Sequence, residues 1–323
     1  MRIKKQKITN DNILVDKVKD YDIQSSSLSL LIKDMLHSGG FESTNLSTGI
    51  NILQKMRKDM KCTKFLSFIG AIMSTGVRGI IRDMLKYKMF DCVITTCGAI
   101  DHDIARTNAK YYSGDLRMDD HILLKKGIHR LGNVLVPQDS YGPVIERKTQ
   151  QCLHELYNKG KKNISTYELL EHMGGLLDES SFLYWASKNH IPVIVPGIVD
   201  GAVGSQLWLF NQRHKDFSIN ILSDETKLSD LVYEAKKTGA FMMGGGISKH
   251  HTLWWNQFRG GLDYAVYITT ASEWDGSLSG ALVTEAISWG KVRDRALQTT
   301  IHGEVSTLLP FIYSVLLENQ TRH

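Results

Sequence analysis

Short β-rich runs alternate with helical patterns along most of this chain, and that alternation limits the folds open to it. The five runs are Lys64 to Ile69, Phe90 to Thr96, Ile191 to Val195, Ala240 to Met243 and Tyr264 to Thr269. Apolar residues at helical spacing predict helices over Val77 to Tyr87, Val144 to Lys159 and Lys227 to Lys237. Strands separated by helices favour βαβ units with parallel strands. The sequence therefore predicts an α/β fold, a Rossmann-like, mostly parallel sheet with helices on both faces.

The first forty residues depart from this pattern. A polar, charged start is followed by apolar residues at helical spacing, and two glycines are expected at the C-cap: Leu28, Leu31, Ile32, Met35 and Leu36, then Gly39 and Gly40. A second helix is predicted over Asn51 to Lys61. No linker or repeat divides the remainder, and 323 residues approach the limit for one core. We expect an N-terminal helical extension over residues 1–40 and a single α/β domain over 41–323.

The composition limits the partners and the compartment. A net charge of +5 arises from 39 basic and 34 acidic side chains mixed along the chain, which gives little sign of nucleic-acid binding. The cysteines form no CxxC pair, so neither a metal site nor a disulfide framework is indicated: Cys62, Cys92, Cys97 and Cys152. No signal peptide or membrane span is recognisable. We expect a cytoplasmic protein without a metal.

Three of the predicted strands run directly into glycine-rich turns. The turns hold Gly98, Gly197 with Gly201, and Gly244 to Gly246. Glycine there lets backbone N–H groups approach a phosphate at a helix N-terminus, although plain strand-to-helix turns would look the same. Parallel strands bring their carboxyl ends to one sheet edge, so three such turns together favour a nucleotide site. The usual GxGxxG fingerprint is absent, because Lys249 occupies the place of its third glycine.

The C-terminal third holds the groups best suited to chemistry. Lys249-His250-His251 follows the triple glycine. A loop with the sequence Glu-Trp-Asp-Gly-Ser-Leu-Ser-Gly spans residues 273–280, and Glu-Ala-Ile-Ser-Trp-Gly-Lys, residues 285–291, closes a short helix that Ser279 could cap. Taken singly, a histidine pair, a lysine or a tryptophan is usually structural or a solvated charge. The order of the motifs is more informative than any one of them.

In that order the motifs resemble the signature of the deoxyhypusine synthase family. The family carries a Gly-Gly-Gly then Lys-His-His block, an Asp-Gly-Ser-x-Ser-Gly-Ala loop and a Glu-Ala-x-Ser-Trp-Gly-Lys segment. Earlier blocks also fit, namely Phe65-Leu66, Ser74 to Arg78, Thr95-Thr96 with Gly98, Arg130 to Asn133, Val136-Pro137 and Asp200-Gly201. The resemblance covers the chain from Ile32 to Leu317, and Trp-Gly-Lys is its most specific part.

The resemblance implies a reaction. Members of the family use NAD to move the 4-aminobutyl group of spermidine, through an imine on an enzyme lysine, to one lysine of translation initiation factor 5A. Lys291 matches the lysine nucleophile, and His250 matches a histidine that carries the proton of the reacting amine. The attacking lysine must be neutral, so a desolvating Trp289 is expected close to it. No metal is implied, because no carbonyl has to be polarised.

The resemblance also implies binding residues. Those implied for the substrate are Asp101, His102, Ser205, Asp275, Gly276, Ser277, Glu285 and Trp289. Glu285 would pair with an ammonium of spermidine and Trp289 would offer a ring face, whereas Asp101 could equally be a helix N-cap. Those implied for NAD are Ser74, Thr96, Gly98, Asp200, Gly245, Thr270, Ala271 and Glu304. Of these, Asp200 and Glu304 suit ribose hydroxyls.

Three positions differ from the eukaryotic pattern of the family. Leu278, Ser205 and His102 occupy places where an acidic residue is usual. Such changes resemble archaeal-type members, and they leave the identity of the polyamine open. The family forms homotetramers built from dimers with active sites at the dimer interface. It also has an N-terminal helix that can block a site entrance, and Met1 to Asp20 is either its counterpart or a disordered segment.

Other functions stay open at this stage. A homospermidine synthase-like enzyme would transfer the same group to a free diamine with the same lysine, histidine and NAD. A non-catalytic NAD-binding scaffold would have lost the lysine chemistry, although Lys291, His250, Trp289 and Glu285 are all present. A thiol enzyme using Cys97 has less support, because no histidine and carboxylate are tied to it by spacing.

Overall fold

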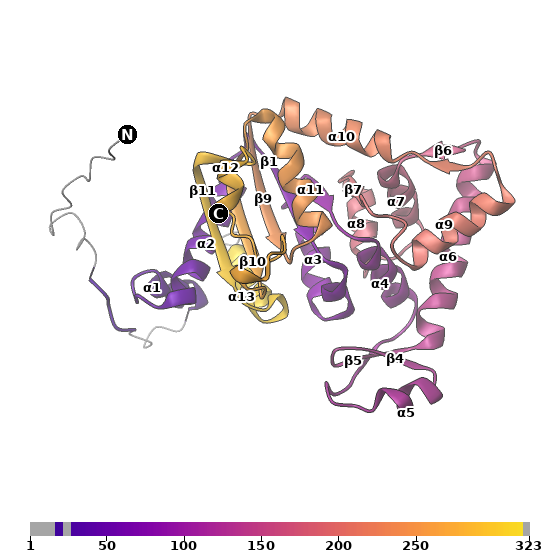
Figure 1. Ribbon diagram of the computed structural model, residues 1–323, viewed down its shortest axis with the longest axis horizontal. Helices are drawn as coiled ribbons and strands as arrows, with labels where there is room; N and C mark the ends of the chain where they lie inside the picture. The colour runs from indigo at the N-terminus through magenta and orange to yellow at the C-terminus, as the bar shows by residue number, and fades with distance from the viewer. Residues whose placement is uncertain (1–16, 22–26, 319–323) are drawn as a thin grey trace.

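The computed structural model describes residues 17–21 and 27–318 of the chain. Its centre is a six-stranded sheet in the order β11-β10-β9-β1-β2-β7, in which every neighbouring pair is parallel. The strands are β1 (Cys62–Phe68), β2 (Cys92–Ile94), β7 (Val193–Ile194), β9 (Lys237–Met243), β10 (Leu262–Thr269) and β11 (Val292–His302). Helices lie on both sides of it (Figure 1). The predicted α/β fold is therefore confirmed.

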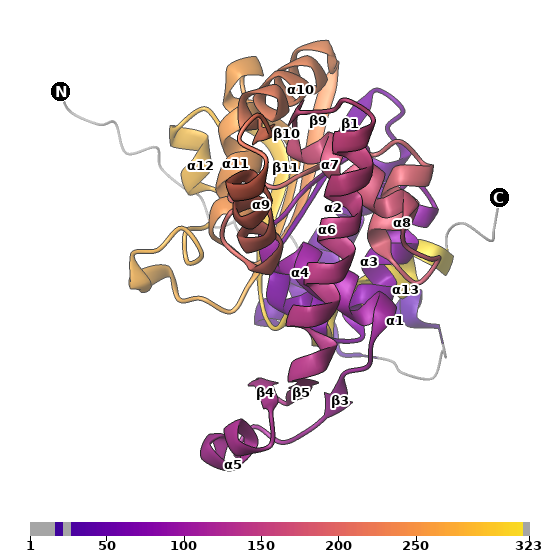
Figure 2. The same ribbon diagram turned by 90° about the vertical axis from the view of Figure 1, so that its right-hand side faces the viewer.

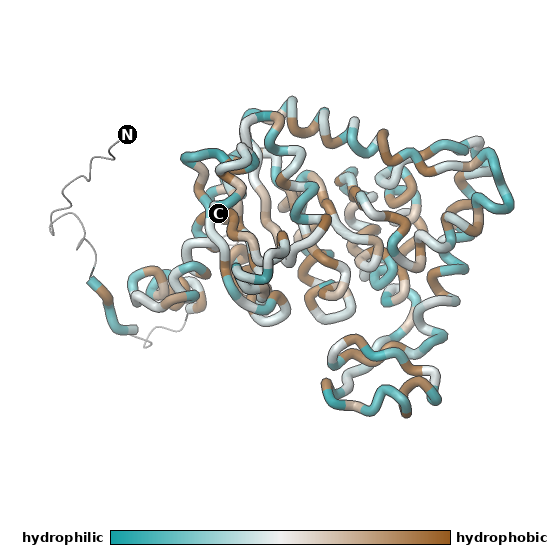
Figure 3. The backbone as a smooth tube through the Cα atoms, viewed as in Figure 1, coloured by the Kyte–Doolittle hydropathy of each residue, from teal (hydrophilic) through white to brown (hydrophobic). Residues whose placement is uncertain are grey.

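Side chains along the central strands point alternately to the two faces of the sheet. In β9, Phe241 joins one buried apolar cluster and its neighbour Met242 joins another. In β10, Val266 and Tyr267 repeat the alternation. Parallel strands covered on both faces have apolar side chains throughout, which explains the short hydrophobic runs in the sequence. Figure 3 shows the segments at this centre in brown and pale colours, with teal on the outer loops.

One side of the sheet, named here the α2 face, is covered by α2 (Phe41–Lys58), α3 (Val77–Lys86), α8 (Phe182–Lys188) and α13 (Val305–Glu318). The short helix α1 (Leu28–Met35) packs on α2 and α13, and its Ile32 is buried in the same cluster. Phe68 of β1 meets Phe182 of α8 edge to face, with ring centroids 5.7 Å apart. Such a pair contributes about 0.5–1.5 kcal/mol beyond its burial. The α2 face is thus an apolar layer in close contact.

The other side, named the α11 face, is covered by α10 (Ile221–Glu234), α11 (Ile247–Asn256) and the single turn α12 (Glu285–Ser288). Leu228 of α10, Leu253 of α11 and Ala286 of α12 pack against the strands. The segment between β10 and α12 is a loop that contains the short η5 (Glu273–Asp275). Figure 2 shows this gold loop at the edge of the molecule beside α11 and α12. The cover of the α11 face therefore includes this loop as well as helices.

A further region joins β2 to β9. It starts with α4 (Cys97–Asn108) after β2, which contacts the earlier η2 (Gly70–Ser74) between β1 and α3. It includes an antiparallel sheet of β3 (Tyr112–Ser113), β5 (Val134–Pro137) and β4 (Ile128–Leu131) with α5 (Asp120–Lys125). Next come η3 (Gln138–Ser140), α6 (Gly142–Asn158), α7 (Thr166–Gly175) and α9 (Ala202–Arg213), and β6 (Asn163–Ile164) pairs with β8 (Ser218–Ile219). The small antiparallel sheet and α5 project from the main body (Figures 1 and 2).

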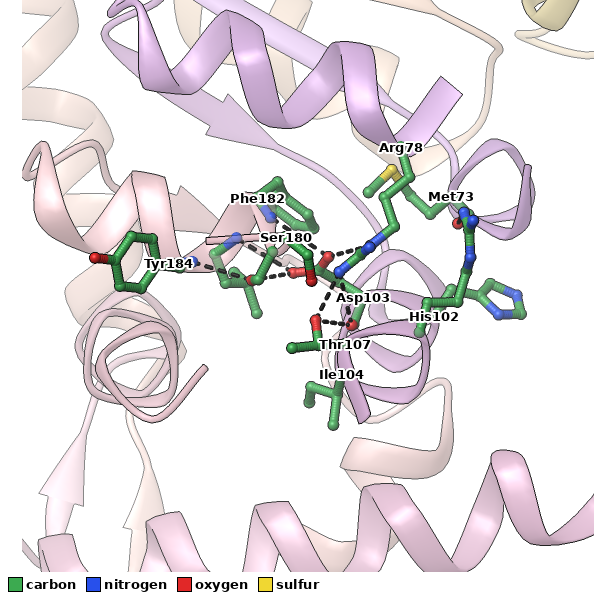
Figure 4. A network of polar contacts seen from close by, with 12 residues as sticks. Met73, Arg78, His102, Asp103, Ile104, Thr107, Ser180, Phe182 and Tyr184 are labelled. Atoms are coloured by element: carbon green, nitrogen blue, oxygen red, sulfur yellow. Dashed lines mark hydrogen bonds and ion pairs between the residues drawn. The ribbon is translucent and has the colours of Figure 1, made fainter. Parts of the chain in front are cut away.

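A buried aspartate of α4 joins three helices. Asp103 is fully buried and pairs with Arg78 Nε of α3 at 2.7 Å, and Arg78 also donates to the Thr107 hydroxyl at 2.6 Å (Figure 4). The second carboxylate oxygen accepts the Ser181 hydroxyl at 2.6 Å and the Leu183 N–H at 3.2 Å, at the start of α8. A carboxylate at a helix N-terminus satisfies free N–H groups and complements the helix dipole. Asp103 therefore ties α8 and α3 to α4.

Several predicted bounds near the N-terminus are wrong. Gly39 and Gly40 do not cap the first helix, which ends at Met35, and Gly40 is instead the N-cap of α2. The second helix begins at Phe41 and not at Asn51, because Leu46 and Ile50 are buried against the α2 face. The start of α2 is polar, so its helical spacing is weak in the sequence and becomes clear only from tertiary packing. The predicted counterpart of the blocking helix, Met1 to Asp20, lies outside the described residues except for 17–20.

Two further differences concern the C-terminal third. β11 was not predicted, because it is an edge strand whose exposed start, residues 293–295, carries charges and lacks apolar alternation. Ser279 does not cap α12, whose N-cap is Thr284. The Ser279 carbonyl instead accepts hydrogen bonds from two β10 side chains, and this contact keeps the residue in the loop before the helix.

Candidate active site

A cavity of about 300 Å³ lies on the α11 face between α11 and α12. Helix α11 supplies one wall, the end of the loop after β10 supplies another, and α12 with the residues that follow it supplies the third. The lining residues are Lys249, His250, Leu253, Trp254, Leu278, Ala281, Leu282, Glu285, Ala286, Trp289 and Lys291. An apolar wall with a few convergent polar groups is typical of a small-molecule site.

Lys291 points into this cavity between two indole rings. It follows α12 and directly precedes β11, and only 9% of its surface is exposed. Its Nζ lies 5.5 Å from the ring centroid of Trp254 and 5.1 Å from that of Trp289. The rings limit the access of water to the amine and favour cationic or polarised groups near it. Trp289 was expected beside this lysine, whereas Trp254 was missed, although it lies one helical turn after His250 and so shares its face of α11.

The two adjacent histidines face different surroundings. His250 lines the cavity and stacks on Trp254, with ring centroids 5.7 Å apart and planes 26° from parallel. Burial and then the charge of Lys291 lower the pKa of His250, so its imidazole is neutral near neutral pH and free to accept a proton. His251 points toward α10, where its Nε2 lies 3.1 Å from the carboxylate of Glu225. Only His250 belongs to the cavity.

Lys249 was not among the predicted site residues, yet it lines the cavity and is 1% exposed. Its Nζ donates to the Leu278 carbonyl at 2.8 Å and to the Ala281 carbonyl at 2.7 Å, and lies 3.6 Å from the ring centroid of Tyr267. Burial lowers the pKa of Lys249 to about 7, and the charge of Glu285 partly opposes this. The signal in the sequence was spacing: Lys249 precedes Leu253 by one turn, on the inward face of α11.

The predicted substrate residues of the loop divide into two groups. Glu285 is the exposed first residue of α12 and lines the cavity. Asp275, Gly276 and Ser277 are exposed and lie at the outer turn of the loop, where Asp275 accepts the Ser277 N–H at 2.7 Å and Gly276 has a φ of +71°. Leu278 is the residue of this motif that faces the cavity.

The residues predicted to bind NAD all follow the carboxyl ends of the six parallel strands. Ser74 comes after β1, Thr96 and Gly98 after β2, Asp200 after β7, Gly245 after β9, Thr270 and Ala271 after β10, and Glu304 after β11. The structure thus brings the three glycine turns to one sheet edge. The helices α4 and α11 start there without a side-chain cap, which leaves backbone N–H groups for an anion. Residues at this edge therefore suit a dinucleotide.

Two of the predicted carboxylates are already engaged in helix contacts. Glu304 accepts the Ser306 N–H at 2.9 Å and the Thr307 N–H at 2.9 Å at the start of α13. Asp101 is 1% exposed and accepts the N–H groups of Ala202 and Val203, both at 2.9 Å, at the start of α9. The N-cap interpretation of Asp101 thus fits its geometry, although the helix it caps is α9 and not its own.

His102 and Ser205 lie on α4 and α9, away from the lining of the cavity. The ring of His102 is hydrogen-bonded to the Tyr111 hydroxyl at 3.0 Å, and burial lowers its pKa to about 4. The exposed Ser205 hydroxyl donates to the Gly201 carbonyl at 3.2 Å. In one chain, therefore, the predicted substrate residues form three groups, one in the cavity, one at the outer turn of the loop and one at α4 and α9.

The turn after β9 and the loop after β10 are in direct contact. A Cβ atom placed on Gly245 would lie 2.1 Å from Ser279 Oγ, closer than real Cβ contacts allow. Gly245 therefore lets the loop rest on the turn that follows β9. The contact joins the predicted cofactor edge to the wall of the cavity.

Other chemistries find less support in the described residues. Burial raises the pKa of Cys97 to about 12, so this side chain is a thiol and a poor nucleophile at neutral pH. In residues 17–21 and 27–318 no group of three or more His, Cys, Asp or Glu side chains could hold a metal ion. Within the same ranges no helix is both long and apolar enough to cross a membrane.

Comparisons with known proteins show the family of this chain. A family model described as deoxyhypusine synthase matches residues 30–316. A relative from Picrophilus torridus is 52% identical over 310 residues, 95% of this chain and 99% of that protein. One from Thermoplasma volcanium is 51% identical over 307 residues, 94% and 98% of the two chains. Both carry the name "probable deoxyhypusine synthase".

A solved structure from Entamoeba histolytica with the same family name covers 93% of this chain and 97% of its own, with a TM-score of 0.63. At 22% identity it supports the fold alone. The parallel sheet and the lysine in an aromatic-lined cavity define an α/β protein with a candidate amine site. The chain belongs to the deoxyhypusine synthase family, and so to a class of transferases.

Proposed function

We propose that this protein transfers the 4-aminobutyl group of spermidine, through an imine on Lys291, to a lysine of translation initiation factor 5A, with NAD as cofactor. The observation that carries the proposal is the Lys291 amine held between Trp254 and Trp289 in one cavity with His250 and Glu285. Family membership supplies the reaction class. The cavity supplies an amine, a proton acceptor and a carboxylate, which are the groups this reaction needs.

The cavity residues would divide the work as follows. When bound, NAD would take a hydride from the carbon beside a donor amine and return it to the same carbon at the end of the cycle. Neutral His250 accepts the proton that the reacting amine loses. Lys291 Nζ attacks the resulting C=N carbon, and 1,3-diaminopropane leaves as the new C=N bond to Lys291 forms. The lysine of the factor then displaces Lys291 by the same addition and elimination.

Glu285 and the indole rings would bind the donor. A carboxylate pairs with an ammonium, and an indole face attracts one, so Glu285 and Trp289 together select a cationic chain. Leu278 makes the facing wall apolar, and Glu285 is the one carboxylate that lines the cavity within the described chain. The donor segment that lies there therefore carries a single charged end beside an apolar stretch.

The sheet edge would hold NAD. The uncapped N-termini of α4 and α11 would face its pyrophosphate. Asp200 would accept its ribose hydroxyls, and Glu304 would do so through the lone pairs that its contacts with Ser306 and Thr307 leave. A hollow of about 450 Å³ near this edge is lined by Ser74 and Ser306 among others. These features support the assignment of Ser74, Thr96, Gly98, Gly245, Thr270 and Ala271 to the cofactor.

Assembly belongs to the same proposal. Trp254 and Trp289, which line the cavity, are 43% and 66% exposed, and Trp274 of the loop after β10 is 91% exposed. Exposed aromatic side chains are typical of protein interfaces, and a second copy there would complete the site. We propose a cytoplasmic homotetramer built from dimers, in which His102 of α4 and Ser205 of α9 face a cavity of another copy, and the buried Asp101 holds the start of α9 in place beside them.

Trapping the imine tests the function. The protein is incubated with NAD and spermidine, reduced with borohydride and digested, and we expect an aminobutyl mass increment on the peptide that contains Lys291. Lys291→Ala should abolish the increment, and an undiminished increment in that variant would contradict the assignment. Adding factor 5A before the reduction should decrease the amount of adduct, because the aminobutyl group is transferred to the factor. If only putrescine decreases the adduct, the enzyme transfers the aminobutyl group to free diamines. If NAD binds but no adduct forms, the protein is a non-catalytic scaffold.

A further inference from the structure

A second lysine in the cavity has no part in the proposed reaction. Lys249 is almost fully buried, and the atoms nearest its amine are two carbonyl oxygens and an aromatic ring. Buried lysines without a paired carboxylate are rare, because the desolvation of an ammonium is costly. Such a side chain is retained where its hydrogen bonds hold something in place.

The surroundings of Lys249 match its hydrogen-bonding capacity. An ammonium has three N–H donors. Two of them reach the Leu278 and Ala281 carbonyls at 2.8 and 2.7 Å, and the face of Tyr267 lies 3.6 Å away for the third. The remaining charged group that acts on it is Glu285 of α12. The lysine is thus directed at the backbone of one short segment.

That segment, residues 278–281, is held at three of its carbonyl groups. Besides the two contacts of Lys249, the Ser279 carbonyl accepts the Tyr267 hydroxyl at 2.7 Å and the Thr269 hydroxyl at 2.9 Å. These donors come from α11 and β10, which are parts of the rigid core. Leu278 and Ala281 line the cavity, so the position of this segment sets the position of one wall.

We propose that Lys249 is a positioning residue that ties residues 278–281 to α11 and thereby fixes the wall of the cavity opposite Lys291. Its effect on the reaction, though not on the loop, rests on the proposed function. Lys249 does not touch the reacting atoms. It preorganises the site for the donor, because a wall that is ordered in advance costs less to order upon binding.

Substitution of Lys249 separates this role from a chemical one. In Lys249→Met we expect the amides of Gly280 and Ala281, which bond the Ser277 carbonyl, to exchange hydrogen about tenfold faster without ligand, because two hydrogen bonds of a charged group are lost. The KM for the donor should rise about tenfold, with kcat changed less than about threefold. Lys249→Arg should return both values toward wild type, since a guanidinium can donate to two carbonyls.

Two controls complete the experiment. Lys291→Met should abolish the borohydride adduct and leave loop exchange unchanged. Tyr267→Phe keeps the ring and removes only the hydroxyl contact to Ser279, so it should speed exchange in the same segment by about threefold, and it tests the tie even if Lys249→Met fails to fold.

The outcomes are distinct. Unchanged loop exchange in folded Lys249→Met, or in Tyr267→Phe, would overturn the proposal. A fall in kcat at constant KM would also overturn it, because it would give Lys249 a chemical role. Faster exchange that Lys249→Arg reverses, in a protein whose wild type forms no adduct with any polyamine, would support the tie and refute the proposed function instead.

Discussion

The two faces of the central sheet contain buried charge in different ways. On the α2 face, α3 and α8 are joined by Asp103 of the neighbouring α4, which has a full set of partners, an arginine of α3 and the N-terminus of α8. On the α11 face, Lys249 donates to backbone carbonyls, and Glu285 acts on it only through space. A buried charge with an oppositely charged partner lowers the stability of the fold little, but removal of the partner lowers it strongly. A buried charge that contacts only dipoles keeps part of its unfavourable desolvation free energy.

The difference indicates what each face does. On the α2 face, removal of the buried charge should lower the free energy of unfolding. On the α11 face, the charged groups surround a cavity. Their removal should therefore change the pH dependence of the unfolding free energy and the KM for the donor. The following predictions test this contrast.

Loss of Asp103 should give the largest effect. Asp103→Ala leaves Arg78 buried without its carboxylate and frees the N-terminus of α8, so we expect the free energy of unfolding to fall by about 3–5 kcal/mol in urea titrations. The matched control is Asp120→Ala. Its carboxylate pairs with Arg130 at 2.6 Å but is 63% exposed, so the loss of stability should be far smaller than in Asp103→Ala. Equal losses in the two variants would refute the contrast.

Lys249 should make stability depend on pH in a defined direction. The pKa of Lys249 is about 7 in the folded protein and 10.5 in an exposed lysine, so between these values the unfolded chain binds more protons at this residue. The free energy of unfolding contributed by Lys249 therefore rises with pH, by up to about 1.4 kcal/mol per pH unit. The neutral amine still has two N–H groups for the two carbonyls.

The measurement is the difference in unfolding free energy between wild type and Lys249→Met from pH 7 to 9. Subtraction removes the titration of other groups, and the difference should grow in favour of wild type as the pH rises. A difference that is constant or declines over this range would show that Lys249 stays charged in the folded protein.

Glu285 should give the smallest effect, and it should appear in binding. Because Glu285 is exposed, Glu285→Gln should raise the KM for a cationic donor roughly fivefold, about 1 kcal/mol, with no change in the melting temperature. The control is Glu273→Gln, an exposed carboxylate of the preceding loop that does not line the cavity. If both variants raise the KM equally, the effect is one of general surface charge.

The central sheet was predictable because the apolar residues that form each strand lie within one short segment of the sequence. β9 and β10 are short apolar runs between helical patterns. A strand that is covered on both faces is apolar throughout, so it can be predicted without knowing which strands pair with it. The carboxyl-end turns at Gly98 and Gly245 followed from the same order, since parallel strands place them together. β11 was missed for the opposite reason: its exposed, charged first half is recognisable as a strand only beside β10.

The site was predictable only in part. Lys291, His250, Glu285 and Trp289 belong to motifs, and the structure brings these four to one cavity. The spacing of Lys249 to Leu253 could have placed it on the inward face of α11, but its role was beyond prediction, because it depends on the carbonyls of Leu278 and Ala281, some thirty residues further along the chain. Side chains that bind backbone leave no complementary residue type in the sequence to reveal them.

The contact between Gly245 and Ser279 has a thermodynamic consequence. The loop that forms the cavity wall rests on the turn that follows β9, where Ser279 occupies the space that a side chain on residue 245 would need. A ligand that shifts the turn must shift the wall, and a ligand that presses on the wall must act on the turn with the same coupling free energy. Cooperativity between a ligand at the turn and a ligand in the cavity would then depend on the absence of a side chain at Gly245.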